Sequence, residues 1–103
     1  MFSVEFPDGT VINENNKFDT YHKTLSKIGI EQVEKIAAEM KYHRRHTPLV
    51  TKSKYEAILN DPTFSYVQEG DCFIIKGLND ITMYNMVMLL DNRLDLQLKV
   101  CYE

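Results

Sequence analysis

The fold is decided by residues 64–102, FSYVQEGDCFIIKGLNDITMYNMVMLLDNRLDLQLKVCY, in this chain of 103 residues. Aromatic and β-branched residues on both sides of Glu69-Gly70-Asp71 predict an antiparallel hairpin over residues 64–76. Residues 81–94 are predicted to form an amphipathic helix, because apolar residues recur there at near-heptad spacing: Met83, Val87, Leu90 and Leu94. Apolar and polar residues then alternate over residues 96–102, which predicts a closing strand.

The N-terminal half predicts a second set of similar elements. Alternating residues before Pro7-Asp8-Gly9, and the β-branched residues Thr10-Val11-Ile12 after it, predict a hairpin over residues 2–12. Two helices are expected next, residues 17–28 and then 30–40, with Gly29 as the residue that ends the first. The capping box Ser53-x-x-Glu56 predicts a short third helix that ends before Pro62.

The expected order of elements is therefore β-β-α-α-(α)-β-β-α-β. Hairpins imply antiparallel pairing, and amphipathic helices need an apolar face to cover. The sequence thus predicts an α+β fold: an antiparallel sheet built from two hairpins and a C-terminal strand, with helices packed on one face. Residues 1–103 are expected to form a single domain, since no linker divides them.

Composition predicts an intracellular protein. The chain is 44% apolar and 26% charged, as is usual for globular proteins. Residues 1–10 lack the basic and apolar regions of an export signal, and the longest apolar run is too short to cross a membrane. We therefore expect a cytoplasmic protein that does not bind membranes, with Cys72 and Cys101 as free, part-buried thiols.

Charge is distributed unevenly along the chain. The net charge is −3, yet residues 40–55, MKYHRRHTPLVTKSKY, contain five Lys or Arg residues and no acid. We call residues 40–55 the basic segment. A general nucleic-acid binder is expected to be basic overall, which this chain is not. Screening over about 8–10 Å nevertheless lets a local basic patch act independently of distant acids.

The basic segment supplies the candidate binding residues. They are cationic, aromatic or imidazole side chains: Lys41, Tyr42, His43, Arg44, Arg45, His46, Lys52 and Lys54. The two arginines offer planar forks suited to carboxylate or phosphate, and tyrosine can stack on bases. Three interpretations stay open: a site for a protein partner with an acidic or nucleic-acid-mimicking face, a DNA or RNA site, and a solvated helix end.

Acidic residues in the C-terminal half suggest a further possibility, self-association. Glu69, Asp71, Asp80, Asp91 and Asp95 are the residues concerned. If they cluster, they form an acidic face that the basic segment of another copy can meet, so a homodimer is possible.

No enzyme motif stands out. A metal-dependent nuclease could draw on Asp8, Glu39 and Lys41, but these lie in a predicted turn and at a helix end rather than on adjacent strands. The two cysteines and His43 and His46 have no recognised zinc spacing, and no glycine loop suits a phosphate. We therefore predict a protein that is not an enzyme, with no metal and no cofactor.

Five segments carry a resemblance: VEFPDGTVI (4–12), KIGIEQV (27–33), PLVTK (48–52), CFIIKGLND (72–80) and LDLQLKV (94–100). Together they resemble a pattern of small uncharacterised α+β domains of bacteria and their mobile elements. The resemblance implies a compact domain and carries no activity. With the small size and segregated charge, it suggests an inhibitor or modulator of a nucleic-acid-processing, defence-type protein complex.

Overall fold

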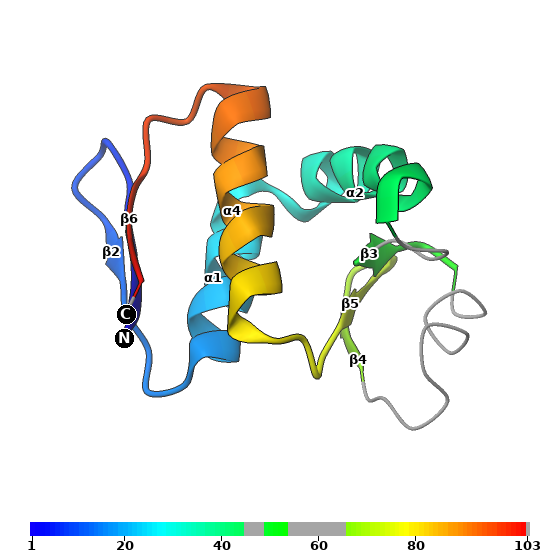
Figure 1. Cartoon of the computed structure of the whole chain (residues 1–103), viewed down its shortest axis with the longest axis horizontal. Coiled ribbons are helices and arrows are strands. Elements are labelled where there is room, and N and C mark those ends of the chain that lie inside the picture. The colour runs from blue at the N-terminus through cyan, green and yellow to red at the C-terminus, as the bar shows by residue number, and fades with distance from the viewer. Residues whose placement is uncertain (45–48, 54–65, 103) are drawn as a thin grey trace. The chain divides into compact units, whose positions relative to one another are not determined.

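The computed structural model describes residues 1–44, 49–53 and 66–102, and the side chains of these residues except 40–44. It divides into two compact units, Met1–Lys27 with Asn79–Glu103, and Ile28–Leu78. Each unit contains its own three-stranded antiparallel sheet and its own buried apolar residues (Figure 1).

The sheet of the first unit joins both ends of the chain. Strand β1 (Phe2–Glu5) lies in the middle, between β2 (Val11–Ile12) and β6 (Lys99–Tyr102), and both neighbours are antiparallel to it. The predicted hairpin turn is present: the Phe6 N–H donates to the Thr10 carbonyl at 2.8 Å, and Gly9 takes φ +92°.

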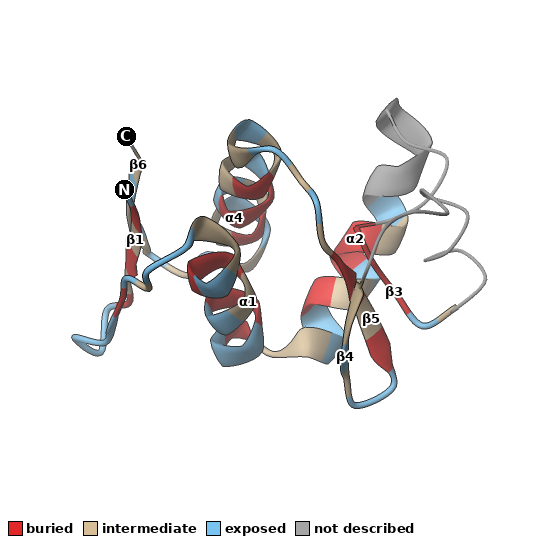
Figure 2. Cartoon of the chain, turned by 90° about the horizontal axis from the view of Figure 1, so that it is seen from below, coloured by how far each residue is buried: buried red, intermediate tan, exposed pale blue. Residues whose placement is uncertain are grey.

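Helices α1 (Lys17–Ile28) and α4 (Asp80–Leu94) cover one face of this sheet, as Figures 1 and 2 both show. Buried residues occur along β1 and on both helices (Figure 2). The apolar core of this unit contains Phe2, Val4, Phe6, Ile12, Tyr21, Leu25, Met83, Met86, Val87 and Leu90. Along β1, Phe2 and Val4 are buried, and Ser3 and Glu5, on the opposite face of the sheet, are half-buried. We call this opposite face, which α1 and α4 do not cover, the open face.

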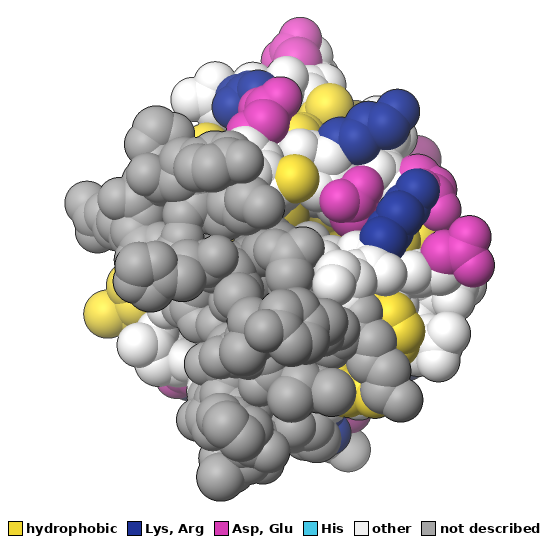
Figure 3. Space-filling model, turned by 90° about the vertical axis from the view of Figure 1, so that its right-hand side faces the viewer, with side chains coloured by type: hydrophobic (Ala, Val, Ile, Leu, Met, Phe, Trp, Pro, Cys, Tyr) yellow, Lys and Arg dark blue, Asp and Glu magenta, His cyan; other side chains and the backbone are white. Residues whose placement is uncertain are grey.

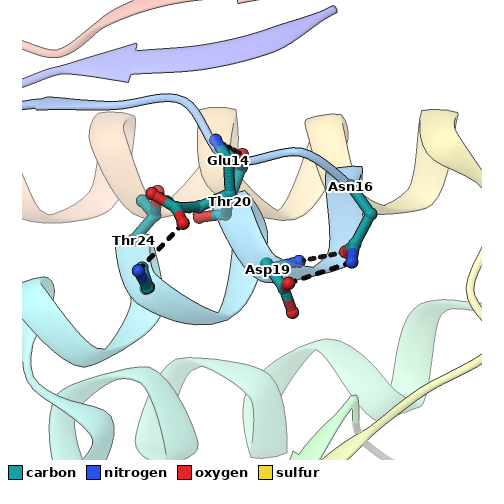
Figure 4. A network of polar contacts seen from close by, with 6 residues as sticks. Glu14, Asn16, Asp19, Thr20 and Thr24 are labelled. Carbon is teal, nitrogen blue, oxygen red and sulfur yellow. Dashed lines mark hydrogen bonds and ion pairs between the residues drawn. The ribbon is translucent and has the colours of Figure 1, made fainter.

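Side-chain caps fix where these helices begin. At α1 the Asn16 Oδ1 accepts from the Asp19 N–H at 2.8 Å, and the Asn16 amide donates to the Asp19 carboxylate at 2.9 Å (Figure 4). At α4 the Asn79 Oδ1 accepts from the Thr82 N–H at 2.8 Å. Both asparagines satisfy amide groups that a helix leaves without partners in its first turn.

The second unit packs one helix on a small sheet. Strand β5 (Cys72–Ile75) lies between β3 (Val50–Thr51) and β4 (Tyr66–Glu69), and α2 (Ile30–Arg44) contacts β3 and β5. The buried apolar residues of this unit are Ile28, Val33, Ile36, Ala37, Leu49, Val50, Cys72, Ile74 and Ile75. Gly29, at φ +114°, separates α1 from α2 as the sequence predicts.

The predicted α+β class and antiparallel pairing are confirmed, and the element order roughly matches the predicted one, with an additional short strand, β3, after α2. The strands, however, divide between two sheets: the closing strand joins the first hairpin, and the second hairpin joins Val50–Thr51. The predicted short helix before Pro62 lies outside the described residues. Whether residues 1–103 behave as one domain stays a prediction.

The closing strand begins at Lys99, so the prediction of strand for residues 96–98 is wrong. Asp95 and Gln97 adopt left-handed φ values of 51° and 57°. The Leu96 N–H donates to the Asp91 carbonyl at 3.2 Å, and the Leu98 N–H donates to Asp91 Oδ1 at 3.0 Å. Asp91 therefore accepts hydrogen bonds from two backbone N–H groups in the stretch that would otherwise extend the strand.

Candidate functional site

The structure describes one end of the basic segment as helix. Lys41, Tyr42, His43 and Arg44 form the last turn of α2, so the helix continues about one turn beyond its predicted apolar stripe. Cations are favoured there because the helix dipole places partial negative charge at the C-terminus. Arg45, His46 and Lys54 lie outside the described residues.

Lys52 is the predicted binding residue whose side chain is described. Its Nζ lies 2.8 Å from Glu31 Oε2, and the two side chains are 51% and 57% exposed. The hydrogen bond to Glu31 and the attraction of its charge raise the pKa of Lys52, so this lysine is cationic at neutral pH. An exposed pair of this kind contributes little to stability and opens readily.

The position of this ion pair separates Lys52 from the other candidates. Glu31 lies in the first turn of α2 and Lys41 near its end. Ten residues of helix span roughly 15 Å, because each residue rises 1.5 Å. Lys52 is therefore located near the start of α2, while Lys41–Arg44 lie at its other end.

The described surface around this unit mixes both signs of charge. On the face in Figure 3, Lys and Arg side chains lie among Asp and Glu side chains, and residues that are not described cover a large part of the view. Residues 41–48 and 54 contain Lys and Arg and no acid in the sequence, and their side chains lie outside the described part of the structure.

A second polar cluster, in the first unit, was not predicted. Lys17 Nζ lies 2.7 Å from Asp80 Oδ2 and 5.1 Å from the centre of the Tyr102 ring. The hydrogen bond from Lys17 is the main cause that lowers the pKa of Asp80, and the same bond raises the pKa of Lys17. Desolvation, followed by a hydrogen bond to Asp80, raises the pKa of Tyr102.

These shifts argue for a structural role of the Lys17–Asp80–Tyr102 cluster. Each group titrates further from neutral pH than usual, whereas general acid–base catalysis favours pKa values near it. The cluster connects the first turns of α1 and α4 with β6. Sequence reasoning missed it because Lys17 and Asp80 are far apart in the chain.

A hollow lies beside this cluster along β6. It measures about 420 Å³ and is lined by Tyr84, Val100, Cys101 and Tyr102. The rings of Tyr84 and Tyr102 lie 5.4 Å apart, and the Phe2 ring meets that of Tyr102 edge-on at 6.1 Å. The hollow is therefore lined by two aromatic residues, Tyr84 of α4 and Tyr102 of β6, together with Val100 and Cys101 of β6.

The two cysteines differ in environment. Cys72 is buried in β5, and burial is the main cause that raises the pKa of its thiol, so it is a poor nucleophile. Cys101 is exposed on β6. Both are free, but the prediction that both are part-buried is wrong, since Cys72 is buried and Cys101 is exposed.

Two acidic side chains of the C-terminal half are engaged locally: Asp80 pairs with Lys17, and the Asp91 carboxylate accepts from the Leu98 N–H. Asp95 caps the C-terminus of α4 through its backbone N–H, which donates to the Asp91 carbonyl. No group of three or more His, Cys, Asp or Glu residues suited to a metal ion occurs within the described parts of the chain. Likewise, none of the helices described here is long and apolar enough to span a membrane.

Asp8, which the nuclease alternative would require, forms an ion pair with Lys27. Its Oδ2 lies 2.9 Å from Lys27 Nζ, and its Oδ1 accepts from the Thr10 N–H at 2.9 Å. The bond from Lys27, followed by that from Thr10, lowers the pKa of Asp8 from 3.8 to about 2. A lowered pKa in the folded state means that ionised Asp8 stabilises the fold above pH 3.8 and that this stabilisation is lost as the pH falls toward 2.

Replacing Asp8 with Asn is therefore expected to lower the urea midpoint of unfolding at neutral pH, with the difference from the wild type disappearing between pH 3.8 and about 2. Asparagine keeps an acceptor for Thr10 but lacks the charge that holds Lys27. Lys27→Gln, which removes the same ion pair from the other side, should give the same pH profile. A difference that persists unchanged at pH 2 would assign the effect to the turn rather than to the ion pair.

Comparisons of the sequence with protein-family models and with curated proteins, and of the structure with solved structures, found no match. Function must therefore be argued from the residues themselves.

Proposed function

We propose that this chain is a small non-enzymatic binding protein that engages an acidic surface of a protein partner through its basic segment. The observation that supports this most is the concentration of five Lys or Arg residues, without an acid, in residues 40–55 of a chain with net charge −3. A protein that is acidic elsewhere is repelled by an acidic partner unless the basic segment faces it.

Within the segment we assign the main contacts to Arg44 and Arg45. Guanidinium groups bind carboxylates through two parallel hydrogen bonds, and Arg is enriched at the energetic centres of interfaces. Lys52 receives a smaller role, because its ion pair with Glu31 locates it near the other end of α2 from Arg44. The finer proposal is that the partner belongs to a nucleic-acid-processing, defence-type complex, whose activity this protein inhibits or modulates.

Direct binding of DNA or RNA is the second candidate. It is favoured by Tyr42, which adjoins Lys41 in the sequence, because an aromatic ring among cations can stack on a base. With four or five phosphate contacts, affinity should fall by roughly 100- to 500-fold between 50 and 200 mM salt.

The two candidates can be separated with one variant and one control. Arg44→Ala/Arg45→Ala removes two cations of the basic segment, and Lys23→Ala/Lys35→Ala removes two exposed cations elsewhere on α1 and α2. Immobilised wild-type protein is used to capture partners from a nuclease-treated lysate. We expect a specific protein to be retained by the wild type and by the lysine control and to be lost with the arginine variant.

The nucleic-acid arm uses fluorescence anisotropy with labelled single- and double-stranded DNA and RNA at low and physiological salt. Salt-sensitive binding that only the arginine variant loses would replace the protein-partner proposal with the nucleic-acid one. If the arginine variant and the lysine control behave alike in both arms, the basic segment is only a solvated helix end.

A further inference from the structure

Strand β6 lies at the edge of its sheet, since it pairs with β1 and the described residues place no strand on its other side. An edge strand exposes unpaired N–H and C=O groups to which another strand can add. The four residues of β6 contain no proline, and Lys99 is its charged residue. The protection of this edge is therefore limited to the shortness of the strand and to Lys99.

The register shows which backbone groups of β6 face outward. In an antiparallel ladder, residues along a strand alternate between bonding to one neighbour and to the other. The Phe6 N–H donates to the Thr10 carbonyl, so Phe6 bonds toward β2, and Val4, opposite Ile12, does the same. Ser3 and Glu5 then bond toward β6.

Ser3 pairs with Cys101 and Glu5 with Lys99, so these two residues of β6 bond to β1. The N–H and C=O groups of Val100 and Tyr102 consequently point away from the sheet. By the same alternation the backbone groups of Leu98 point away from β1, but the Leu98 N–H already donates to Asp91 Oδ1 at 3.0 Å. Asp91 thus limits the available edge to Val100 and Tyr102.

We propose that two copies of this chain associate by antiparallel pairing of their β6 edges, with Val100 of each copy opposite Tyr102 of the other. This register joins the outward groups of Val100 and Tyr102 in both copies. The twofold axis then passes between the two Cys101 residues, which form a non-hydrogen-bonded pair. The two sheets become one continuous sheet of the order β2-β1-β6-β6-β1-β2.

The side chains favour a second copy over an unrelated peptide. Val100 and Tyr102 line the hollow of about 420 Å³ together with Tyr84, and in this register Tyr102 of each copy lies opposite Val100 of the other, beside that hollow. The edge therefore brings the same two side chains, one aliphatic and one aromatic, together from both copies. Lys99 of one copy lies four positions from Lys99 of the other, or about 13 Å, which exceeds the screening length at physiological salt.

A shifted register fits less well. Pairing Val100 with Val100 of the second copy would require the Leu98 N–H, which Asp91 already occupies. It would also bring the two Lys99 residues to two positions apart, about 7 Å, where their charges repel more strongly.

The test uses Cys101, because it lies on the open face and directly at the proposed axis. The association of wild type, Cys101→Ser, Cys101→Lys and Cys101→Glu is measured by sedimentation equilibrium. Like charges directly opposite each other in a sheet repel, so Cys101→Lys should raise the dimer dissociation constant about fivefold. An equimolar mixture of the Lys and Glu variants should regain dimers, while Cys101→Ser should associate like the wild type.

Two controls separate this interface from others. Ser3→Lys adds a charge on the same open face but on β1, opposite Cys101 of its own chain, and should weaken the dimer less than Cys101→Lys. Mild oxidation with diamide, which takes up the two protons and two electrons of a thiol pair, should link wild-type dimers and the Cys72→Ser variant but not Cys101→Ser. A monomer at every soluble concentration, or a dimer that Cys101→Lys leaves unchanged and Arg44→Ala/Arg45→Ala dissociates, would overturn the proposal.

Discussion

Replacing Leu90 with alanine is expected to lower the free energy of unfolding by about 2–5 kcal/mol. Leu90 lies on α4 and is fully buried, with a relative exposure of 0%. It belongs to the face of α4 that also buries Met83, Met86 and Val87. The substitution removes methyl groups from a packed core and leaves a cavity that its neighbours fill only in part.

Leu89→Ala is the matched control, because it removes the same atoms from the adjacent position of the same helix. Leu89 is only half-buried and lines an open hollow between α4 and the residues that follow it. Leu89→Ala should lower the free energy of unfolding clearly less than Leu90→Ala does, as measured by urea unfolding followed by circular dichroism. Equal effects would show that α4 packs with a different face toward the core.

Local patterns in the sequence predict most of the elements. Asn16 and Asn79 cap the two helices of the first unit, because their side chains accept hydrogen bonds from first-turn N–H groups. Gly29 ends α1 because it adopts a positive φ, which glycine tolerates. The bounds of α1 follow directly from such signals. The prediction fails at residues 96–98, where alternation indicates a strand but the Asp91 side chain holds the backbone.

The division of the strands between two sheets could not be predicted. β2 and β3 contain only two residues each, which is too short for a pattern to show a preferred partner. The closing strand could have joined either hairpin, since both contain aromatic and β-branched residues that suit a half-buried sheet. The choice depends on contacts between residues far apart in the sequence, which local periodicity does not contain.

The candidate binding residues show the same limit. Composition identifies the basic segment, and helical periodicity places Lys41 near the end of a helix. Lys52 pairs with Glu31, near the start of that helix, because β3 packs on α2. The sequence alone does not show this packing. The alternation of residues 98–102 does assign Cys101 to the face opposite Val100 and Tyr102, but not to the edge of the sheet.

Replacing Ile74 with alanine is expected to be as damaging to the second unit as Leu90→Ala is to the first. Ile74 is fully buried on β5, the middle strand, and pairs with Val50 on one side and Val67 on the other. Its truncation should lower the free energy of unfolding by about 2–5 kcal/mol, whereas Val67→Ala, on the half-buried edge strand, should cost less.

Hydrogen exchange then tests whether residues 1–103 unfold as one domain, as we predict. If they do, Ile74→Ala lowers the protection of the most stable amides about thirtyfold or more in both units, and Leu90→Ala does the same. The effect would reach α4 from β5 because cooperative unfolding exposes all core amides together. Loss of protection confined to Ile28–Leu78 with Ile74→Ala would instead show that the two compact units unfold independently.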